Sequence, residues 1–409
     1  MKYNTYTLKN GLRVIHLGST SPVVYCGYEI NAGTRLEKAG EEGLAHFCEH
    51  TTFKGTTRRK AWHILNCLES VGGDLNAFTN KEGTVYYAAV LKDHINRAVD
   101  ILTDIVFHSV YPQAEIDKEV EVICDEIESY NDSPAELIYD EFENIVFKGH
   151  PLGHNILGKA EQVRQFKTED ALRFTHQYYR PERAIFFIYG DVDFKRVIKL
   201  LEKYTADFPE QKPFIEPEKE PLPLRYQPGK YIYDKGTHQA HVMIGNQGYA
   251  IHDQRRMPLY LLNNILGGPG MNAKLNLALR EHNGLVYTVE SSMVSYGDTG
   301  LWCTYFGCDP NDVNRCLRIV RRELQKFTDK PLSQHQLQAA KKQIKGQVGV
   351  ACDNRENFAI DFGKSFLYYG WEKDITNLYA QIEAITAEQI QAVAQEIFDE
   401  NKMTTLIFK

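Results

Sequence analysis

The first half of the chain contains short strand-like runs and longer amphipathic stretches of helical period. Apolar residues recur at every second position in the short runs, and Asn10-Gly11 between the first two runs is a favoured two-residue hairpin turn. The longer stretches repeat apolar residues at intervals of three and four, the period of a helix with one buried face. The predicted strands are 6–8, 12–17, 23–31, 76–79, 84–90 and 184–189, and the predicted helices are 43–53, 95–107 and 113–130. Because strands and helices do not alternate strictly, the pattern favours an α+β fold over a doubly wound sheet.

A proline-rich segment divides the chain into two halves. Six prolines lie between Phe208 and Gly229, among charged residues with little periodicity. This composition is typical of a semi-rigid linker, which we place at 209–229. The length of 409 residues also favours two domains. The predicted domains are therefore 1–208 and 230–409.

Composition and charge narrow the classes of function. The chain is 43% hydrophobic and 25% charged, as in soluble globular proteins. A net charge of −7 without a basic run argues against a nucleic-acid partner. No run approaches the ~18 apolar residues of a membrane span, and the amino terminus has the pattern of a strand rather than a secretory signal. We therefore expect a cytoplasmic protein without a membrane partner, whose eight scattered cysteines are reduced thiols.

The strongest chemical signal is His46-Phe47-Cys48-Glu49-His50, in the predicted helix 43–53. Residues i and i+4 lie on one helix face, so both imidazoles can reach one metal ion. Glu49 lies on the same stripe, where its carboxylate can reach a water on that ion. The H-x-x-E-H spacing is the signature of inverted zincins, and a chance arrangement of surface residues is the alternative. Cys48 points to the opposite side of the helix, so we expect it in the core.

A catalytic zinc site needs a third protein ligand and an open position for water. The predicted helix 113–130 is rich in acidic residues, and Glu119 and Glu126 share one of its faces because they lie two turns apart. An ordinary acidic surface face explains this pattern equally well. The helix therefore offers candidate ligands without selecting one.

The two halves of the chain contain an internal repeat. Residues 95–102 (INRAVDIL) resemble residues 313–320 (VNRCLRIV), 218 positions later, and each run follows a strand-like segment. At this offset, the positions that match the two histidines of the motif are Asn264 and Gly268. We therefore predict a duplication in which only the first half has a metal site.

Together these motifs resemble the pitrilysin/insulysin family of inverted-zincin metallopeptidases, in its half-length bacterial form, which is similar to the mitochondrial processing peptidase subunits. The resemblance covers nearly the whole chain. Its motifs are GLAHFCEHTTFKGT at 43–56, GGDLNAFT at 72–79, EVEVICDEI at 119–127, HPLG at 150–153, ILG at 156–158 and LREHNGLVY at 279–287. Cys48 and Thr51 replace the leucine and methionine that are common in the family.

The resemblance implies a zinc endopeptidase with one Zn²⁺ per chain. It assigns His46, His50 and Glu126 as metal ligands, Glu49 as the catalytic base and Glu119 as a supporting acid. The implied fold has two homologous domains, each a mostly antiparallel sheet with helices packed on one face. In the implied assembly, these halves form a clamshell with a second subunit.

The resemblance also implies how substrate is bound. Arg280 and Tyr287 of the second domain match a pair that contacts substrate, and Asn76 and Ala77 match an edge strand that binds extended peptides by strand addition. Peptides or unfolded segments are the expected substrates, and a homodimer is expected because one chain carries both sets of residues. The alternatives are a non-catalytic scaffold, such as a core subunit, and one subunit of a heterodimeric processing peptidase. The glycine-rich segment 267–270 is expected to be a structural turn, with substrate contact as its alternative.

Overall fold

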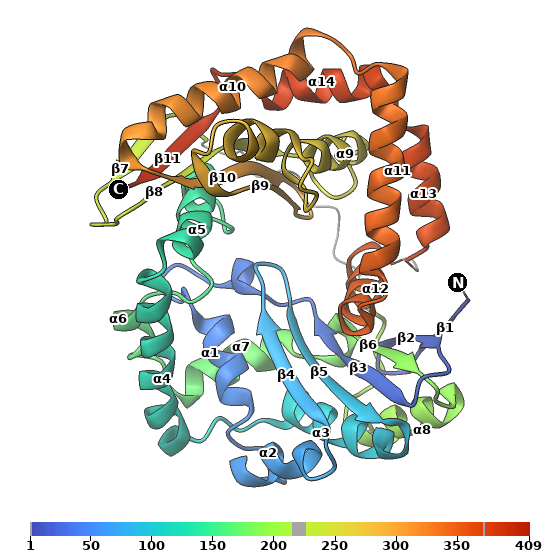
Figure 1. Cartoon of the computed structure of the whole chain (residues 1–409). Coiled ribbons are helices and arrows are strands. Elements are labelled where there is room, and N and C mark those ends of the chain that lie inside the picture. Colours follow the sequence, from blue (N-terminus) through green and yellow to red (C-terminus); the bar gives the residue numbers. More distant parts are fainter. Residues whose placement is uncertain (1, 215–225, 371–372) are drawn as a thin grey trace. The chain divides into compact units, whose positions relative to one another are not determined.

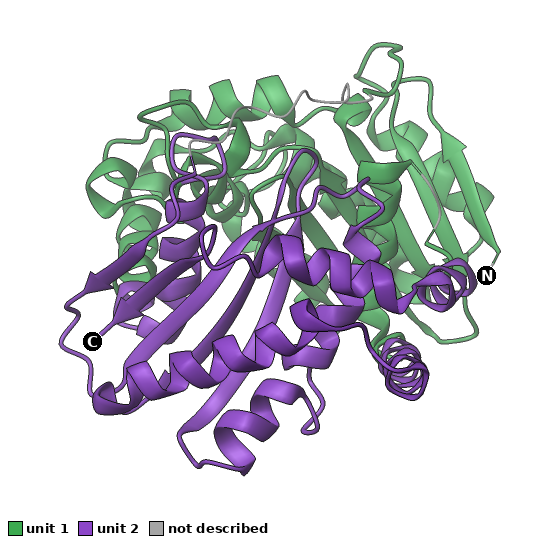
Figure 2. Cartoon of the chain, turned by 90° about the horizontal axis from the view of Figure 1, so that it is seen from above, with its two compact units in different colours: residues 1–128, 154–217, 351–374 green, residues 129–153, 218–350, 375–409 purple. Residues whose placement is uncertain are grey.

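The computed structural model describes residues 2–214, 226–370 and 373–409, which form two compact units (Figure 1). Neither unit is continuous in the sequence (Figure 2). Unit 1 contains Met1–Glu128, His154–Pro217 and Ala351–Asp374, and unit 2 contains Ser129–Gly153, Glu218–Val350 and Ile375–Lys409. Each unit is built on one sheet with helices packed against it, so the predicted α+β class is confirmed.

Unit 1 contains a six-stranded sheet in the order β1-β2-β6-β3-β5-β4. Its strands are β1 (Tyr3–Thr7), β2 (Arg13–Gly18), β3 (Val23–Ile30), β4 (Asp74–Thr79), β5 (Thr84–Leu91) and β6 (Ala184–Gly190). Neighbouring strands are antiparallel except for the parallel pair β2 and β6. The predicted hairpin forms, but its loop spans residues 8–12 rather than two residues. Within this loop the Asn10 amide nitrogen donates to the Thr205 hydroxyl, and the Asn10 amide oxygen accepts from the Leu12 backbone N–H.

Most helices of unit 1 cover one face of this sheet. Alternate residues of β3, such as Cys26 and Tyr28, point into an apolar core that these helices share. The opposite face is covered by α12, whose Phe358 and Phe362 pack edge-on against Tyr189. The helices are α1 (Leu44–Thr52), α2 (Ala61–Glu69), α3 (Ile95–His108), α4 (Gln113–Asn131), α6 (Ala160–Val163), α7 (Thr168–Tyr178), α8 (Phe194–Tyr204) and α12 (Arg355–Tyr369).

Unit 2 contains a five-stranded sheet in the order β7-β11-β8-β10-β9, in which only β7 and β11 are parallel. Its strands are β7 (Lys230–Tyr233), β8 (Ala240–Gly248), β9 (Val286–Ser295), β10 (Gly300–Cys308) and β11 (Thr404–Phe408). Its helices are α5 (Pro134–Val146), α9 (Arg256–Gly267), α10 (Val313–Asp329), α11 (Gln334–Ala351), α13 (Ile375–Ala384) and α14 (Ala387–Ile397), with a π-helical segment at Asn276–Glu281.

The two sheets repeat one topology and one register. Strands β2, β6, β3, β5 and β4 of unit 1 correspond in order to β7, β11, β8, β10 and β9 of unit 2. One row of paired residues crosses each sheet: Val14, Phe186, Tyr28 and Tyr86 in unit 1, and Lys230, Thr405, Ile244 and Thr304 in unit 2. The offset between Tyr86 and Thr304 is the same 218 residues that the sequence repeat gave. The prediction of two homologous domains is therefore confirmed.

One helix from each half of the chain belongs to the other half's unit. Helix α5 packs on strands β8 and β11 of unit 2, and its repeat counterpart α12 packs on β6 and β3 of unit 1. The predicted domains, 1–208 and 230–409, therefore differ from the compact units by the segments that carry these two helices. Periodicity shows that a helix has an apolar face, but it does not show which sheet buries that face. Residues 215–225 of the predicted linker lie outside the described residues.

In the parts of the chain that the structure describes, each helix is too short or too polar to cross a lipid bilayer.

Candidate metal centre

The helix that carries the histidine motif is buried on almost every side. All residues of α1 except His50 are buried, and Cys48 lies in the core as predicted. The Glu37 carboxylate holds the start of the helix, because it accepts hydrogen bonds from the free backbone N–H groups of Gly43 (3.0 Å) and Ala45 (2.7 Å). His154 Nε2 donates a further bond to Glu37 at 2.9 Å. These contacts hold the start of α1 in place.

His46, His50 and Glu126 come together as the sequence predicted. One potential ligand atom from each of the three side chains lies within 4.8 Å of the other two. Glu126 Oε2 is 3.2 Å from His50 Nε2 and 3.7 Å from His46 Nε2. The histidines come from one turn of α1 and the glutamate from α4, so a local motif is completed by a residue from a distant helix.

Glu119 lies beside this cluster and contacts His50 from behind. Its Oε1 accepts a hydrogen bond from His50 Nδ1 at 3.1 Å, and its Oε2 pairs with Lys54 Nζ at 2.6 Å. This hydrogen bond orients the His50 ring, so that its other nitrogen, Nε2, points towards Glu126. Lys54 was not assigned a role from the sequence, although it lies within the motif at 43–56.

The surroundings set the protonation of the cluster. Burial and the neighbouring His50 lower the pKa of His46 to about 4, so this imidazole is neutral near pH 7. Burial also lowers the pKa of His50, but its hydrogen bonds to Glu119 and Glu126 outweigh this effect and raise the pKa to about 9. The hydrogen bond from His50 keeps the pKa of Glu126 below its ordinary value. A metal ion would therefore have to displace a proton from His50.

Glu49 lies on the same helix as the histidines but is not one of the three clustered ligand candidates. Its Oε2 accepts a hydrogen bond from the Thr79 hydroxyl at 2.9 Å. Glu49 is only 8% exposed, and this burial raises the pKa of its carboxyl. The carboxyl therefore binds a proton more readily than a carboxyl in water. Thr79 was not assigned a role from the sequence, although its motif at 72–79 was recognised. It reaches Glu49 because β4 packs against α1.

The donor set fits a zinc ion. Two imidazole nitrogens and one carboxylate oxygen are a known catalytic zinc set, and it leaves a fourth position for water or substrate. Ligand atoms about 2.1 Å from a tetrahedral zinc lie roughly 3.4 Å from one another. The two nitrogen–oxygen separations, 3.2 Å and 3.7 Å, lie on either side of this value. The carboxylate behind His50 is also a common feature of zinc-binding histidines.

The predicted substrate residues belong to different units. Asn76 and Ala77 belong to β4, the edge strand of the unit 1 sheet, and Thr79 of the same strand contacts Glu49. Arg280 and Tyr287 lie together in unit 2, with the guanidinium carbon 5.2 Å from the centre of the tyrosine ring. Tyr287 is 79% exposed, which is unusual for so large a side chain. The glycine at 267 is explained by packing, because a side chain there would collide with Ser291.

Relatives of similar length are named as zinc proteases. The "Uncharacterized zinc protease YmxG" of Bacillus subtilis (strain 168) is 31% identical over 403 residues, which cover 98% of this chain and 97% of the relative. An "Uncharacterized zinc protease" of Rickettsia bellii (strain RML369-C) is 32% identical over 410 residues, which cover 99% and 97% of the two chains. These matches extend through both halves of the chain.

Family and structure comparisons agree with these relatives. The family described as "Insulinase (Peptidase family M16)" matches residues 13–160, and the one described as "Peptidase M16 inactive domain" matches residues 165–344. A solved protease structure from Helicobacter pylori has the same fold, with a TM-score of 0.89 at 22% identity over 100% of this chain and 99% of that chain. The chain therefore belongs to peptidase family M16, the insulinase family.

Proposed function

We propose that this protein is a zinc-dependent endopeptidase that hydrolyses peptides or unfolded segments. The observation that carries the proposal is the cluster of His46, His50 and Glu126 within 4.8 Å, with Glu49 on the same helix as the histidines. A structural metal site is usually closed by four protein ligands, whereas three ligands leave a position for chemistry. The names of the relatives support the same conclusion.

The roles of the side chains follow from their positions. His46, His50 and Glu126 would hold the zinc ion, which when bound polarises a substrate carbonyl and acidifies a water molecule. Glu49 would take the proton from the attacking water and pass it to the leaving amine nitrogen. The raised pKa of Glu49 suits this exchange, because it brings the proton affinity of the carboxyl closer to neutral pH. The Thr79 hydroxyl occupies one carboxylate oxygen and so orients the other.

Substrate would bind along β4 as an added strand. This strand is at the edge of its sheet, and its Thr79 touches the candidate base. The main chain of Asn76 and Ala77 would form hydrogen bonds with the backbone of the peptide substrate. We therefore expect the enzyme to accept substrates with many different side chains. Arg280 and Tyr287 would contact the substrate carbonyl and the developing oxyanion, since both donate hydrogen bonds.

We further propose that the active form is a homodimer in which the Arg280–Tyr287 pair of one chain serves the zinc site of the other. The exposure of Tyr287 supports this role, because a tyrosine that only packed within unit 2 would be covered. One chain carries both sets of residues, which favours a homodimer over a heterodimeric processing peptidase. The complete set of ligands and base favours an enzyme over a non-catalytic scaffold.

The decisive test compares the wild type with Glu49→Gln. Glutamine keeps the size of the side chain and the oxygen that Thr79 contacts, but it cannot accept the water proton. Elemental analysis should find about one zinc per chain in both proteins. A quenched fluorogenic peptide should be cleaved by the wild type, with turnover reduced about 10²–10⁴-fold or more in the variant.

Glu69→Gln is the matched control, because it removes an exposed carboxylate of α2 that lies outside the site. Its turnover should equal that of the wild type. Turnover that survives in Glu49→Gln would refute the assigned base. A wild type that holds no zinc and cleaves no peptide would favour the scaffold.

A further inference from the structure

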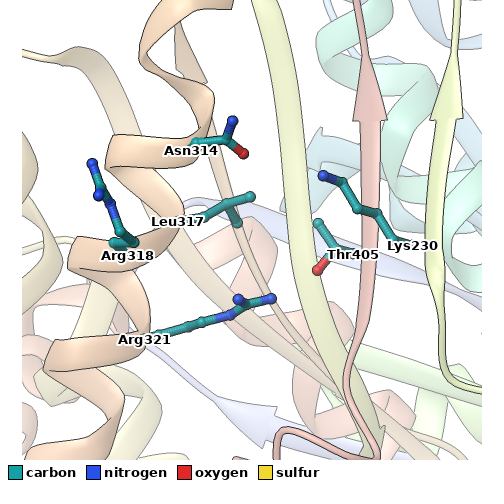
Figure 3. A pocket seen from close by; sticks show the side chains of 6 residues that line it. All are labelled: Lys230, Asn314, Leu317, Arg318, Arg321 and Thr405. Carbon is teal, nitrogen blue, oxygen red and sulfur yellow. The ribbon is translucent and has the colours of Figure 1, made fainter.

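Unit 2 contains a cationic cavity of about 390 Å³ between α10 and the strands β7 and β11 (Figure 3). Figure 3 shows Lys230 and Arg321 extending into this space from opposite sides. The residues that line the cavity are Lys230, Asn314, Leu317, Arg318, Arg321 and Thr405. None of them belongs to the metal centre or to the proposed substrate contacts.

The internal repeat allows this cavity to be compared with the matching place in unit 1. The four lining residues of α10 correspond, at the offset of 218, to Asn96, Val99, Asp100 and Thr103 of α3. In unit 1, helix α8 packs on α3, and the Tyr204 hydroxyl bonds to Asn96 at 3.2 Å. Phe194 of α8 also stacks on His16 of β2. Within the described ranges of unit 2, α14 packs on α10, but the residues that line the cavity come from α10, β7 and β11.

The exposed strand residues of unit 2 agree with this comparison. In the matching rows of the two sheets, Lys230 corresponds to Val14, and Ile232 corresponds to His16. Val14 is fully buried and His16 is 5% exposed, whereas Ile232 is 49% exposed and Lys230 is exposed. The strand positions that are buried in unit 1 are therefore exposed in the described structure of unit 2.

The chemistry of the two places also differs. Where unit 1 has Val14, Asp100 and Thr103, unit 2 has a lysine and two arginines. An apolar helix face that packs like α8 would bury these charges, which is costly without partners. The substitutions therefore favour a negatively charged occupant over a second copy of the α8 arrangement.

The positive charges are not neutralised by the chain itself. In the described parts of the structure, neither Lys230 nor Arg318 forms an ion pair, and Arg321 has one distant contact, 4.0 Å from the exposed Glu400. Three cations around one cavity repel one another, and an anion of two or more charges relieves this repulsion. A net charge of −7 for the whole chain makes such a local excess of positive charge more distinctive.

We propose that this cavity binds a small ligand that bears two or more phosphate groups. Arginine matches phosphate oxygens with its planar fork of N–H donors, and lysine adds a point charge. The Asn314 amide and the Thr405 hydroxyl line the same space and can donate further hydrogen bonds to phosphate oxygens. A volume of about 390 Å³ is within the usual range for small-molecule sites.

Isothermal titration with inorganic triphosphate tests the proposal on the full chain, and it requires no peptidase activity. The wild type should bind one triphosphate per chain at physiological ionic strength. The double variant Lys230→Gln/Arg321→Gln should bind about tenfold or more weakly, because each lost contact is a hydrogen bond to a charged group. Circular dichroism and the melting temperature confirm that the variant is folded, and its peptide turnover should equal that of the wild type.

The matched control is Arg322→Gln/Lys330→Gln, which removes the same amount of positive charge. Arg322 lies on α10 and Lys330 directly follows it, and both are exposed and outside the cavity. This variant should retain wild-type affinity for triphosphate. An equal loss of triphosphate affinity in the two double variants would mean that the chain attracts anions through its positive side chains in general. This result would overturn the proposed site. Absence of binding at millimolar triphosphate, or tighter binding of citrate than of triphosphate, would overturn the phosphate assignment.

Discussion

At the scale of single residues, Glu119 and Glu126 differ in role although the sequence places them on the same helix face. Only Glu126 approaches both histidines, while Glu119 contacts the far side of His50 and Lys54. The residues alone left both acids as candidates, and the family resemblance chose between them. The structure gives the physical basis for that choice, because two turns of α4 separate the two carboxylates along the site.

Replacing Glu119 by glutamine should weaken zinc binding without removing a ligand. The neutral amide holds the His50 ring less firmly and makes its nitrogen a weaker donor to the metal, so the dissociation constant should rise about 10–100-fold. Competition with a metallochromic chelator measures this change. Glu128→Gln on the exposed side of α4 is the control, and an equal affinity in both variants would contradict the role of Glu119.

Glu29 gives a prediction about pH. This residue of β3 is 2% exposed, its Oε1 has no hydrogen-bond partner, and burial raises the pKa of the carboxyl well above its ordinary value. The folded chain therefore keeps a proton that the unfolded chain releases above about pH 4.3. Consequently, the contribution of Glu29 to the free energy of unfolding falls as the pH rises from that value towards the folded-state pKa.

Glu29→Gln should abolish the fall in the free energy of unfolding at higher pH, because glutamine stays neutral. The variant should be more stable than the wild type at pH 8, by about 1–3 kcal/mol, and the difference should shrink as the pH approaches 4.5. Urea unfolding of both proteins at several pH values measures the difference in the free energy of unfolding. An exposed control, Glu202→Gln on α8, should show no such trend. A variant that is less stable at pH 8 would refute the argument.

At the scale of elements, the position of α1 depends on a cap that lies outside the helix. Helix α1 begins after Gly43, whose φ of +96° suits glycine, and a side chain there would also meet the Leu157 carbonyl oxygen. Glu37 supplies the acceptor that the first helical N–H groups lack, and it is anchored by His154. The metal ligands are therefore placed by contacts before and after the motif in the sequence.

Glu37→Gln should destabilise the start of α1. Its amide nitrogen would face a backbone N–H group in place of an acceptor oxygen, which costs about 1–3 kcal/mol for a buried site. We expect a lower melting temperature and weaker zinc binding together, measured by calorimetry and chelator competition. Glu41→Gln removes a charge from the same loop at a more exposed side chain and should change neither quantity greatly. Unchanged zinc affinity in Glu37→Gln would show that the cap does not position the ligands.

At the scale of the whole molecule, the two units repeat one fold but differ in chemistry. The metal ligands lie in unit 1, the Arg280–Tyr287 pair lies in unit 2, and the exchanged helices α5 and α12 tie the halves of the chain to both units. Each half of the chain therefore needs a segment of the other to complete its sheet packing. We do not expect residues 1–208 to be stable alone, because α12 would be missing from the unit 1 sheet.

The proposed homodimer can be tested by mixing two inactive variants. Glu49→Gln retains the Arg280–Tyr287 pair, and Tyr287→Phe retains the base. If the pair of one chain serves the site of the other, the mixed dimer contains one complete site. Subunit exchange should then restore up to about a quarter of wild-type turnover, because half of the dimers are mixed and each has one of two sites. No recovery after exchange, verified by mass spectrometry of tagged chains, would refute the shared site.

The sequence by itself determined the features that depend on neighbours in the chain. The His46–Glu49–His50 geometry follows from the helical turn, the strands and helices follow from apolar periodicity, and the duplication follows from the repeat at 218. The tertiary structure alone decided which sheet buries α5 and α12, how Thr79 and Glu37 support the motif, and which residues line the α10 cavity. These features arise from packing between distant segments. Local periodicity records that a face is apolar or charged, but only the folded chain determines what that face contacts.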